Sequence, residues 1–171
     1  MRPTLYILCG KVGSGKSTFA KKLEVQGVLR FSQDEKALSR IQAFRRPDDG
    51  YRVVDEKTLR AAEAEARSEI VGLALTALRQ GKSVVIDDGF WRKTERDHYR
   101  ELAAQAGAYT ILYYFPIEPD EQWRRLQIRN QGDLTLVHFI SHDDLEYLNK
   151  FFEPPKEEGE AIVSQDFSLR T

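Results

Sequence analysis

The sequence predicts an α/β fold with a mainly parallel sheet, and two features of the chain indicate it. Short apolar runs of strand length alternate along the 171 residues with amphipathic stretches of helical length, and glycines end several of them. Strands that alternate with helices form β–α–β units with parallel strands, whose ligands bind at the carboxyl ends of the strands. A chain of this length can bury a substantial core, so we expect a single domain over residues 1–171.

The expected strands are short, apolar and bounded by polar or glycine residues. The fourth of them is apolar almost throughout, which predicts that both of its faces are covered. The five strands are expected at residues 4–9, 28–31, 83–87, 109–115 and 161–164.

The expected helices carry apolar residues at steps of three and four, a pattern typical of a helix with one buried face. In the longest helix these residues are Leu59, Ala62, Ala66, Ile70, Leu73 and Ala77. Residues 32–52 are polar and rich in turn-forming residues, so we expect this segment to be irregular. The helices are expected at residues 16–26, 53–80, 95–106, 119–130 and 143–152.

Composition narrows the class of protein. The formal net charge of −1 provides no broad electrostatic attraction for nucleic acid or for an anionic membrane surface. No apolar run approaches the ~18 residues that cross a membrane. Cys9 is the sole cysteine, so no internal disulfide can form and a reducing compartment is expected. We therefore expect a cytoplasmic protein without a nucleic-acid or membrane partner.

A glycine-rich loop between the first strand and the first helix is the strongest motif in the chain. The segment "GKVGSGKS" fits the pattern G-x-x-x-x-G-K-[ST] in full, with a strand before it and a helix after it. Glycines allow consecutive backbone N–H groups to turn inward around an anion, and the helix N-terminus adds positive potential there. The predicted nucleotide-binding residues are Gly10, Lys11, Val12, Gly13, Ser14, Gly15, Lys16, Ser17 and Thr18.

This motif predicts ATP and Mg²⁺ as ligands. Lys16 would reach the β- and γ-phosphates, and the Ser17 hydroxyl would be a magnesium ligand. A guanine-nucleotide protein is disfavoured because the chain has no N-K-x-D motif.

Carboxylates follow two of the expected strands at the same edge of the sheet. Asp87 ends the third strand, where an acidic residue can hold Mg²⁺ directly or through water, and Asp88 is its alternative. Asp34 follows the second strand and could accept the proton of an attacking hydroxyl, with Glu35 as a weaker candidate. The structural alternatives are a loop cap for Asp87 and a helix N-cap for Asp34.

Basic residues gather on the helix expected at 119–130. Arg125 and Arg129 are four residues apart and share a face, where like charges repel unless an anion lies between them. We interpret them as catalytic residues that clamp nucleotide phosphates, and the alternative is a solvated basic face. Arg96 is more readily explained as part of a solvated basic face than as a ligand for an anionic substrate. We interpret His138 as ordinary, since the histidines lack zinc-like spacing.

Five pieces of the chain, "GKVGSGKST", "SQDE", "DDGFW…ERD", "WRRLQIRN" and "FFEPP", occur in an order that resembles a known family. This family comprises the small P-loop kinases grouped with zeta toxin, chloramphenicol phosphotransferase and polynucleotide 5′-kinase, and especially the bacterial "AAA family ATPase" proteins. The resemblance implies a three-layer P-loop NTPase fold with a five-stranded parallel sheet in the order 2-3-1-4-5. It also implies helices on both faces and a short helical lid.

The resemblance further implies that ATP with Mg²⁺ supplies a γ-phosphoryl group, that Asp34 is the base, and that Arg125 and Arg129 are lid arginines. Asp88 departs from the family pattern, because many relatives have an apolar residue at this position. We therefore expect a kinase that phosphorylates a hydroxyl of a small molecule such as an antibiotic, sugar, nucleoside or related metabolite. The alternatives are a nucleic-acid 5′-end kinase and a non-catalytic ATP-dependent switch or binding protein. The sequence leaves the acceptor and the oligomeric state open.

Overall fold

The computed structural model describes residues 2–41, 56–132, 138–163 and 169–170, and its centre is a six-stranded sheet in the order β2-β3-β1-β4-β5-β6. The first five strands pair in parallel, which confirms the predicted order 2-3-1-4-5. The sixth strand was not predicted and pairs antiparallel with β5 at the edge. The strands are β1 (Thr4–Gly10), β2 (Leu29–Ser32), β3 (Val84–Asp87), β4 (Tyr109–Phe115), β5 (Ala161–Val163) and β6 (Leu169–Arg170).

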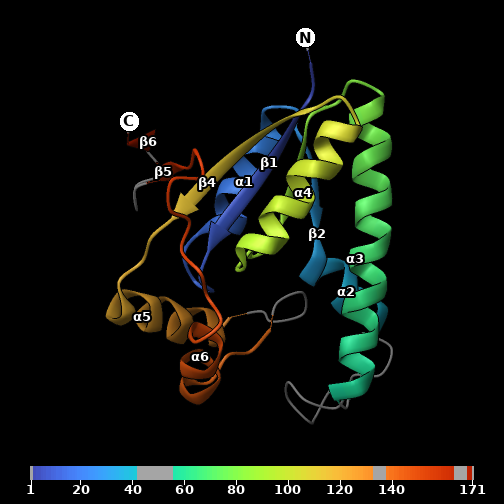
Figure 1. The fold of residues 1–171 in the computed structure, drawn as a ribbon. Helices are drawn as coiled ribbons and strands as arrows, with labels where there is room; N and C mark the ends of the chain where they lie inside the picture. Colours follow the sequence, from blue (N-terminus) through green and yellow to red (C-terminus); the bar gives the residue numbers. More distant parts are fainter. Residues whose placement is uncertain (1, 42–55, 133–137, 164–168, 171) are drawn as a thin grey trace.

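Helices cover both faces of this sheet, so the predicted three-layer arrangement is confirmed. Figure 1 shows α1 on one side and α3 and α4 on the other. Phe19 and Leu23 of α1 pack on Leu8 and Val85, while Ile70 of α3 belongs to the cluster on the opposite face. The helices are α1 (Lys16–Val25), α2 (Gln33–Ile41), α3 (Glu56–Arg79), α4 (Lys93–Gln105), α5 (Pro119–Asn130) and α6 (His142–Asn149).

Strand β4 is less covered than the sequence predicts. Tyr109 is 58% exposed and Ile111 is 37% exposed. On one side β5 pairs with Tyr113 and Tyr114, and no strand of the described residues lies beside the first half of β4, so this half is an edge of the described sheet. The prediction that β4 is covered on both faces is therefore wrong for its first half.

The expectation of an irregular segment after β2 is also wrong in its first part, because α2 occupies Gln33–Ile41. Its apolar residues Ala37, Leu38 and Ile41 are too few to give a clear periodic signal. They are buried against Ala62 and Ala66 of α3, so a tertiary contact stabilises this short helix. The rest of that expectation, residues 42–52, lies outside the described residues.

Helix α3 follows the predicted pattern with one shift. Its expected beginning at residues 53–55 lies outside the described residues, and its described part ends at Arg79, one residue before the predicted end. Leu73, which the pattern places on the buried face, is 44% exposed, and Ala74 is buried in its place. The buried face of α3 therefore shifts slightly around the helix axis between Ala66, which packs against α2, and Ala74, which packs against the sheet.

Helices α5 and α6 form the predicted helical lid beyond the carboxyl ends of the strands (Figure 1). A small apolar cluster lies between them and contains Leu126 of α5, Ile140 of the connecting segment and Leu145 of α6. A capping box starts α6, because Ser141 and Asp144 exchange hydrogen bonds at its N-terminus. None of the described helices is both long and apolar enough to span a membrane.

A buried arginine ties α4 to the segment that leads into β5. The Arg96 side chain is 1% exposed and donates through Nε and Nη2 to Glu158, at 3.0 and 2.6 Å. Its Nη1 atom donates to the backbone oxygens of Phe90, Trp91 and Glu153. Arg96 is thus a structural residue, and the interpretation favoured from the sequence, a solvated basic position, is wrong because the side chain is buried and fully paired.

We predict that Arg96→Met lowers the free energy of unfolding by about 3 kcal/mol, because the substitution leaves Glu158 buried with a weaker set of partners. Arg100 still donates to Glu158, at 3.0 Å, which should limit the loss. Urea denaturation would measure the effect, with Arg92→Met at an exposed neighbouring position as the matched control. Equal midpoints for the two variants would contradict the structural role of Arg96.

Candidate active site

The glycine loop links the end of β1 to the start of α1 and has the backbone geometry that the motif predicts. Gly13 and Gly15 have φ values of 78° and 99°, in the left-handed region that favours glycine. A Cβ atom at Gly13 would also lie 3.3 Å from Leu126 of α5, and one at Gly10 would lie 2.7 Å from Ser14 Oγ. Both backbone conformation and close packing therefore require glycines in this loop.

The N-terminus of α1 is left open to a ligand. Its N-cap residue, Gly15, offers no side chain, and the first turn contains no acidic residue. The first N–H groups of a helix have no intrahelical acceptor, so they point toward the loop as donors. Lys16 stands at the same point and donates through Nζ to the oxygens of Gly10 and Lys11, at 2.9 and 2.8 Å. Amide donors and an ammonium group together make an anion site.

The lid helices hold the glycine loop from one side. Gln122 of α5 is fully buried and donates through Nε2 to the backbone oxygen of Val12, at 2.8 Å. The same amide exchanges hydrogen bonds with Asn149 of α6. The loop is thereby fixed to both lid helices before any ligand binds.

Ser17 and Asp87, the predicted magnesium ligands, lie together. The Ser17 hydroxyl donates to Asp87 Oδ1 at 2.9 Å, and the Asp87 side chain is 4% exposed. Its other oxygen, Oδ2, accepts from Nε and Nη2 of Arg30 at 3.1 and 2.7 Å. Arg30 was not predicted as a site residue, although an arginine inside the apolar run "VLRF" was an available signal.

The contacts of Arg30 also distinguish the two candidates for the catalytic base, Asp34 and Glu35. Through Nη1 and Nη2 Arg30 forms a bidentate pair with Glu35, at 3.0 and 2.6 Å. Both oxygens of Glu35 are therefore engaged with a buried guanidinium. Asp34, in contrast, lines the cleft described next, and its side chain is 57% exposed.

An open cleft of about 1670 Å³ runs along the carboxyl edge of the sheet, between the glycine loop, the lid helices and α2 and α3. Most of the predicted site residues line it. Of the remaining three, Gly10 and Ser14 are buried within the loop, and Lys11 lines a second hollow. The predicted residues that line the cleft are Val12, Gly13, Gly15, Lys16, Ser17, Thr18, Asp34, Asp87, Arg125 and Arg129.

Two residues that sequence reasoning missed face Asp34 across the cleft. His138 Nε2 lies 3.6 Å from Asp34 Oδ1 and also 3.6 Å from Glu63 Oε1 of α3. Desolvation by the surrounding walls of the cleft would raise the pKa of Asp34, but His138, Lys16 and Arg129 outweigh it and lower this pKa below its ordinary value. Asp34 is therefore ionised at neutral pH. No local pattern connects His138 or Glu63 with Asp34, since they come from separate segments.

A further acidic group, Asp88, lies on the wall formed by α3 and α4. Burial, together with the nearby Glu95, raises the pKa of Asp88 to about 6. Arg67 of α3 lies near both carboxylates, at 3.8 Å from Asp88 and 3.5 Å from Glu95, and donates to Gln33 at 3.1 Å. Arg67 thus links α2, α3 and α4 at this wall.

The two predicted lid arginines differ in their partners. Arg125 donates through Nε to Glu121 on its own helix, at 2.6 Å. Arg129 donates through Nη2 to the backbone oxygen of His138, at 2.8 Å, while its buried Nε atom has no partner among the described residues. Arg129 therefore keeps an unused donor beside the cleft.

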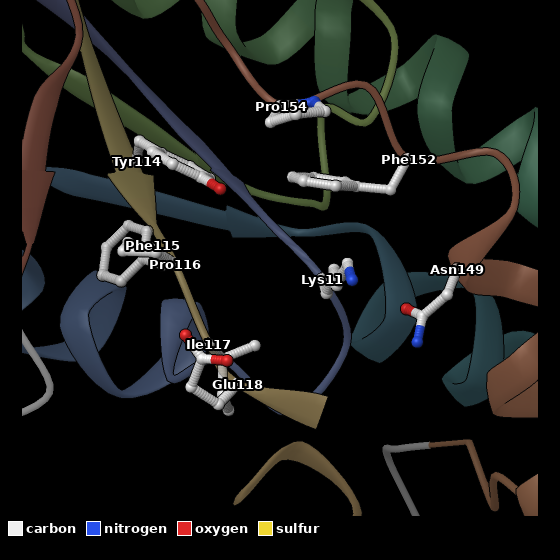
Figure 2. Close-up of a pocket in the computed structure, with 9 residues that line it drawn as sticks. All are labelled: Lys11, Tyr114, Phe115, Pro116, Ile117, Glu118, Asn149, Phe152 and Pro154. Atoms are coloured by element: carbon white, nitrogen blue, oxygen red, sulfur yellow. The ribbon is translucent and has the colours of Figure 1, made fainter. Parts of the chain in front are cut away.

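A second hollow of about 280 Å³ lies at the end of β4, on the other side of the glycine loop. Figure 2 shows Phe152 beside Pro154, with Tyr114 and Lys11 nearby. The rings of Tyr114 and Phe152 are stacked with centroids 6.3 Å apart, and Lys11 Nζ lies 5.9 Å from the Phe152 centroid. The hollow is thus walled by flat rings next to a loop cation.

The chain belongs to the family described as an AAA domain, AAA_33, whose model matches residues 5–155. Its fold is that of the small P-loop kinases. A protein assigned as a kinase, from Chloroflexus aurantiacus j-10-fl, is 19% identical and superposes with a TM-score of 0.72, over 96% of this chain and 90% of that one.

Two ligand-bound structures share the fold. Kti12 of Chaetomium thermophilum, in complex with ADP-AlF3, is 18% identical with a TM-score of 0.67, over 95% of this chain and 89% of that one. Mycobacterium tuberculosis APS kinase CysC, in complex with AMPPNP and APS, is 16% identical with a TM-score of 0.59, over 96% and 92%. No curated protein matches the sequence. At these identities the structural likeness shows the fold alone.

We predict that Asp88→Asn stabilises the protein at pH 7 and changes little near pH 4. Because the pKa of Asp88 is raised from 3.8 to about 6, the folded protein keeps a proton that the unfolded chain releases, and stability falls as pH rises between these values. At pH 7 the gain from the substitution should be about 3 kcal/mol. An asparagine oxygen can still accept from the Gly89 N–H group, as Asp88 does.

Thermal unfolding of wild type and variant at both pH values would measure this difference. The matched control is Asp97→Asn, because a hydrogen bond from Lys93 lowers the pKa of that exposed carboxylate, and its loss should give no gain at pH 7. An Asp88→Asn effect of equal size at both pH values would show that the Asp88 carboxylate is not destabilised by burial.

Proposed function

We propose that this protein is a phosphotransferase that moves the γ-phosphoryl group of ATP to a hydroxyl of a small molecule. The observation that carries the proposal is the opening of three features into one cleft. These are the uncapped α1 N-terminus with Lys16, the Ser17–Asp87 pair and the ionised Asp34. An anion site and a carboxylate base facing the same space are what transfer to a hydroxyl requires.

The donor phosphates would bind at the glycine loop. Lys16 Nζ now uses two backbone oxygens as acceptors, and a phosphate would replace them with stronger, charge-assisted partners. Burial lowers the pKa of Lys16, although Asp87, Asp88 and Asp34 oppose the shift, and a bound phosphate group would further favour its charged form. The fold shared with nucleotide-bound proteins supports this assignment.

Ser17 and Asp87 fit a magnesium ion. Their oxygens are hard ligands 2.9 Å apart, and Mg²⁺ is usually held by one or two carboxylates together with substrate phosphates and water. No group of three acidic, histidine or cysteine side chains able to hold a metal occurs in the described part of the chain, so this pair would depend on the nucleotide for further ligands. When bound, the ion would neutralise charge on the β- and γ-phosphates.

Asp34 would act on the acceptor. The acceptor oxygen forms a bond to the γ-phosphorus while the bond from that phosphorus to the bridging oxygen of ADP breaks. The hydroxyl proton passes to the Asp34 carboxylate, which is available because its pKa is lowered. Arg129, with its unused Nε donor, and Arg125 would neutralise charge on the transferred group.

The base of the nucleotide would lie in the hollow at the end of β4. Strand β4 is on the opposite side of β1 from β3 and β2. The donor would therefore extend from the glycine loop toward the stacked rings of Tyr114 and Phe152, while the acceptor enters from the side of Asp34.

A small-molecule acceptor is favoured over a nucleic-acid end. The net charge of −1 gives no general attraction for a polyanion, and on the acceptor side of the cleft Asp34 and Glu63 offset the positive charge of the arginines of α3. Among structures of the same fold, APS kinase CysC is bound to a small substrate, whereas a Pnkp1/Rnl/Hen1 RNA repair complex also contains this fold. From the sequence we also propose that the chain forms a single domain and that the protein is cytoplasmic.

The proposal predicts that Asp34→Asn reduces phosphoryl transfer about a hundredfold or more and leaves ATP affinity unchanged, because Asp34 faces the acceptor rather than the phosphates. Wild-type protein would first be screened with ATP, Mg²⁺ and a panel of sugars, nucleosides and antibiotics, with products identified by mass. Glu35→Gln is the matched control, since the Glu35 carboxylate is bound to Arg30.

Lys16→Ala in the same assay should abolish ATP binding or turnover, and this variant gives the background rate. Transfer by Asp34→Asn at the wild-type rate would remove Asp34 from the mechanism. Tight ATP binding with no acceptor-dependent product in the panel would favour the alternative of a nucleotide-dependent switch.

A further inference from the structure

His138 occupies a position that neither the motifs nor the proposed transfer explains. It belongs to the connection between α5 and α6, yet its imidazole faces carboxylates from two other helices. Its Nε2 atom lies 3.6 Å from Asp34 of α2 and 3.6 Å from Glu63 of α3. The His138 side chain is 26% exposed and lines the cleft. One imidazole therefore joins the lid to both helices of the acceptor wall.

The backbone around His138 is held by the last residues of α5. Arg129 donates through Nη2 to the His138 oxygen at 2.8 Å. Asn130 donates to the Ile140 oxygen at 2.7 Å and accepts from the Ile140 N–H group at 3.4 Å. Ile140 is itself 9% exposed, in the cluster with Leu126. His138 is thus presented by an anchored segment.

The charges that face His138 favour its cationic form. Asp34 and Glu63 are its acidic neighbours, and Arg129 opposes them from α5. Burial would lower the pKa of His138, but the two carboxylates outweigh burial and Arg129 and raise it. Around these acids, Lys16 faces Asp34, while Arg67 and Arg60 face Glu63. A cationic imidazole between two carboxylates restricts the positions that each carboxylate can take.

We propose that His138 is a positioning residue, which bridges Asp34 and Glu63 as an imidazolium and so aligns the Asp34 carboxylate toward the acceptor hydroxyl. This inference rests on the proposed function, because it assigns to His138 a role in the same transfer. Proton transfer needs the base within hydrogen-bonding reach of the hydroxyl, and a freely rotating carboxylate meets that geometry less often. Deprotonation of His138 at higher pH removes the charge that holds the bridge.

The first test measures the bridge without any enzyme activity. NMR titration of isotope-labelled protein would follow the three histidines, with His138 assigned from the His138→Gln variant. We expect His138 to titrate above about 6.5, the value of an unperturbed imidazole, and its titration midpoint to fall in Glu63→Gln and in Asp34→Asn. A midpoint that is unchanged by both substitutions would overturn the bridge.

The second test separates positioning from a purely structural role. We expect His138→Gln to lower kcat roughly ten- to a hundredfold with an unchanged KM for ATP, because the His138 imidazole faces Asp34 and Glu63 on the acceptor side of the cleft. In wild type, kcat should fall as pH rises through the pKa of His138, whereas His138→Lys, which keeps the charge, should retain its rate at high pH. His142→Gln, at a half-exposed site on α6, is the matched control.

Wild-type kcat and an unchanged pH profile in His138→Gln would overturn the positioning role. The titration could show the bridge in a protein that transfers no phosphoryl group to any acceptor. That result would overturn the proposed function and the role of His138 in it, while the bridge between His138, Asp34 and Glu63 would stand.

Discussion

The register of the parallel sheet is the constraint on which the rest of the site depends. Ser32 at the end of β2 is level with Asp87 at the end of β3, and Ile7 of β1 is level with Ile86. This alignment brings Asp87 to the start of α1, where it accepts from Ser17, and beside β2, where Arg30 holds it. A slip of one residue in β3 would turn Asp87 to the other face of the sheet and leave the buried Arg30 guanidinium with Glu35 as its remaining carboxylate partner.

Charges of both signs line the cleft. The glycine loop supplies Lys16 and N–H donors, while α3 supplies Glu63 together with Arg60 and Arg67. Residues of opposite charge connect the sides: Lys16 lies near Asp34, and His138 reaches from the lid to Asp34 and Glu63. Because burial raises the pKa of Asp88, an ionised Asp88 lowers the stability of the folded protein at neutral pH.

The sequence predicted those features that local rules and strand order determine. The glycine motif predicted the loop, and the ends of two apolar runs predicted that Ser17 and Asp87 lie at one edge of the sheet, because parallel strands present their carboxyl ends together. Helix α2 was missed because its stability comes from α3 rather than from its own pattern. His138 and Glu63 could not be connected with Asp34 from the sequence, since a lid segment and two helices meet there only in the folded chain. The catalytic roles of Asp34, Arg125 and Arg129 stay predictions.

The central claim is that the loop from Gly10 to Ser17 binds the triphosphate of a nucleotide beside Asp87. A crystal structure with a non-hydrolysable ATP analogue and Mg²⁺ tests it most directly. We expect the phosphates inside the loop, Lys16 Nζ moved from the oxygens of Gly10 and Lys11 onto a phosphate, and the metal ion bound by Ser17 and close to Asp87. An analogue bound elsewhere, with Lys16 still on its two backbone oxygens, would contradict the claim.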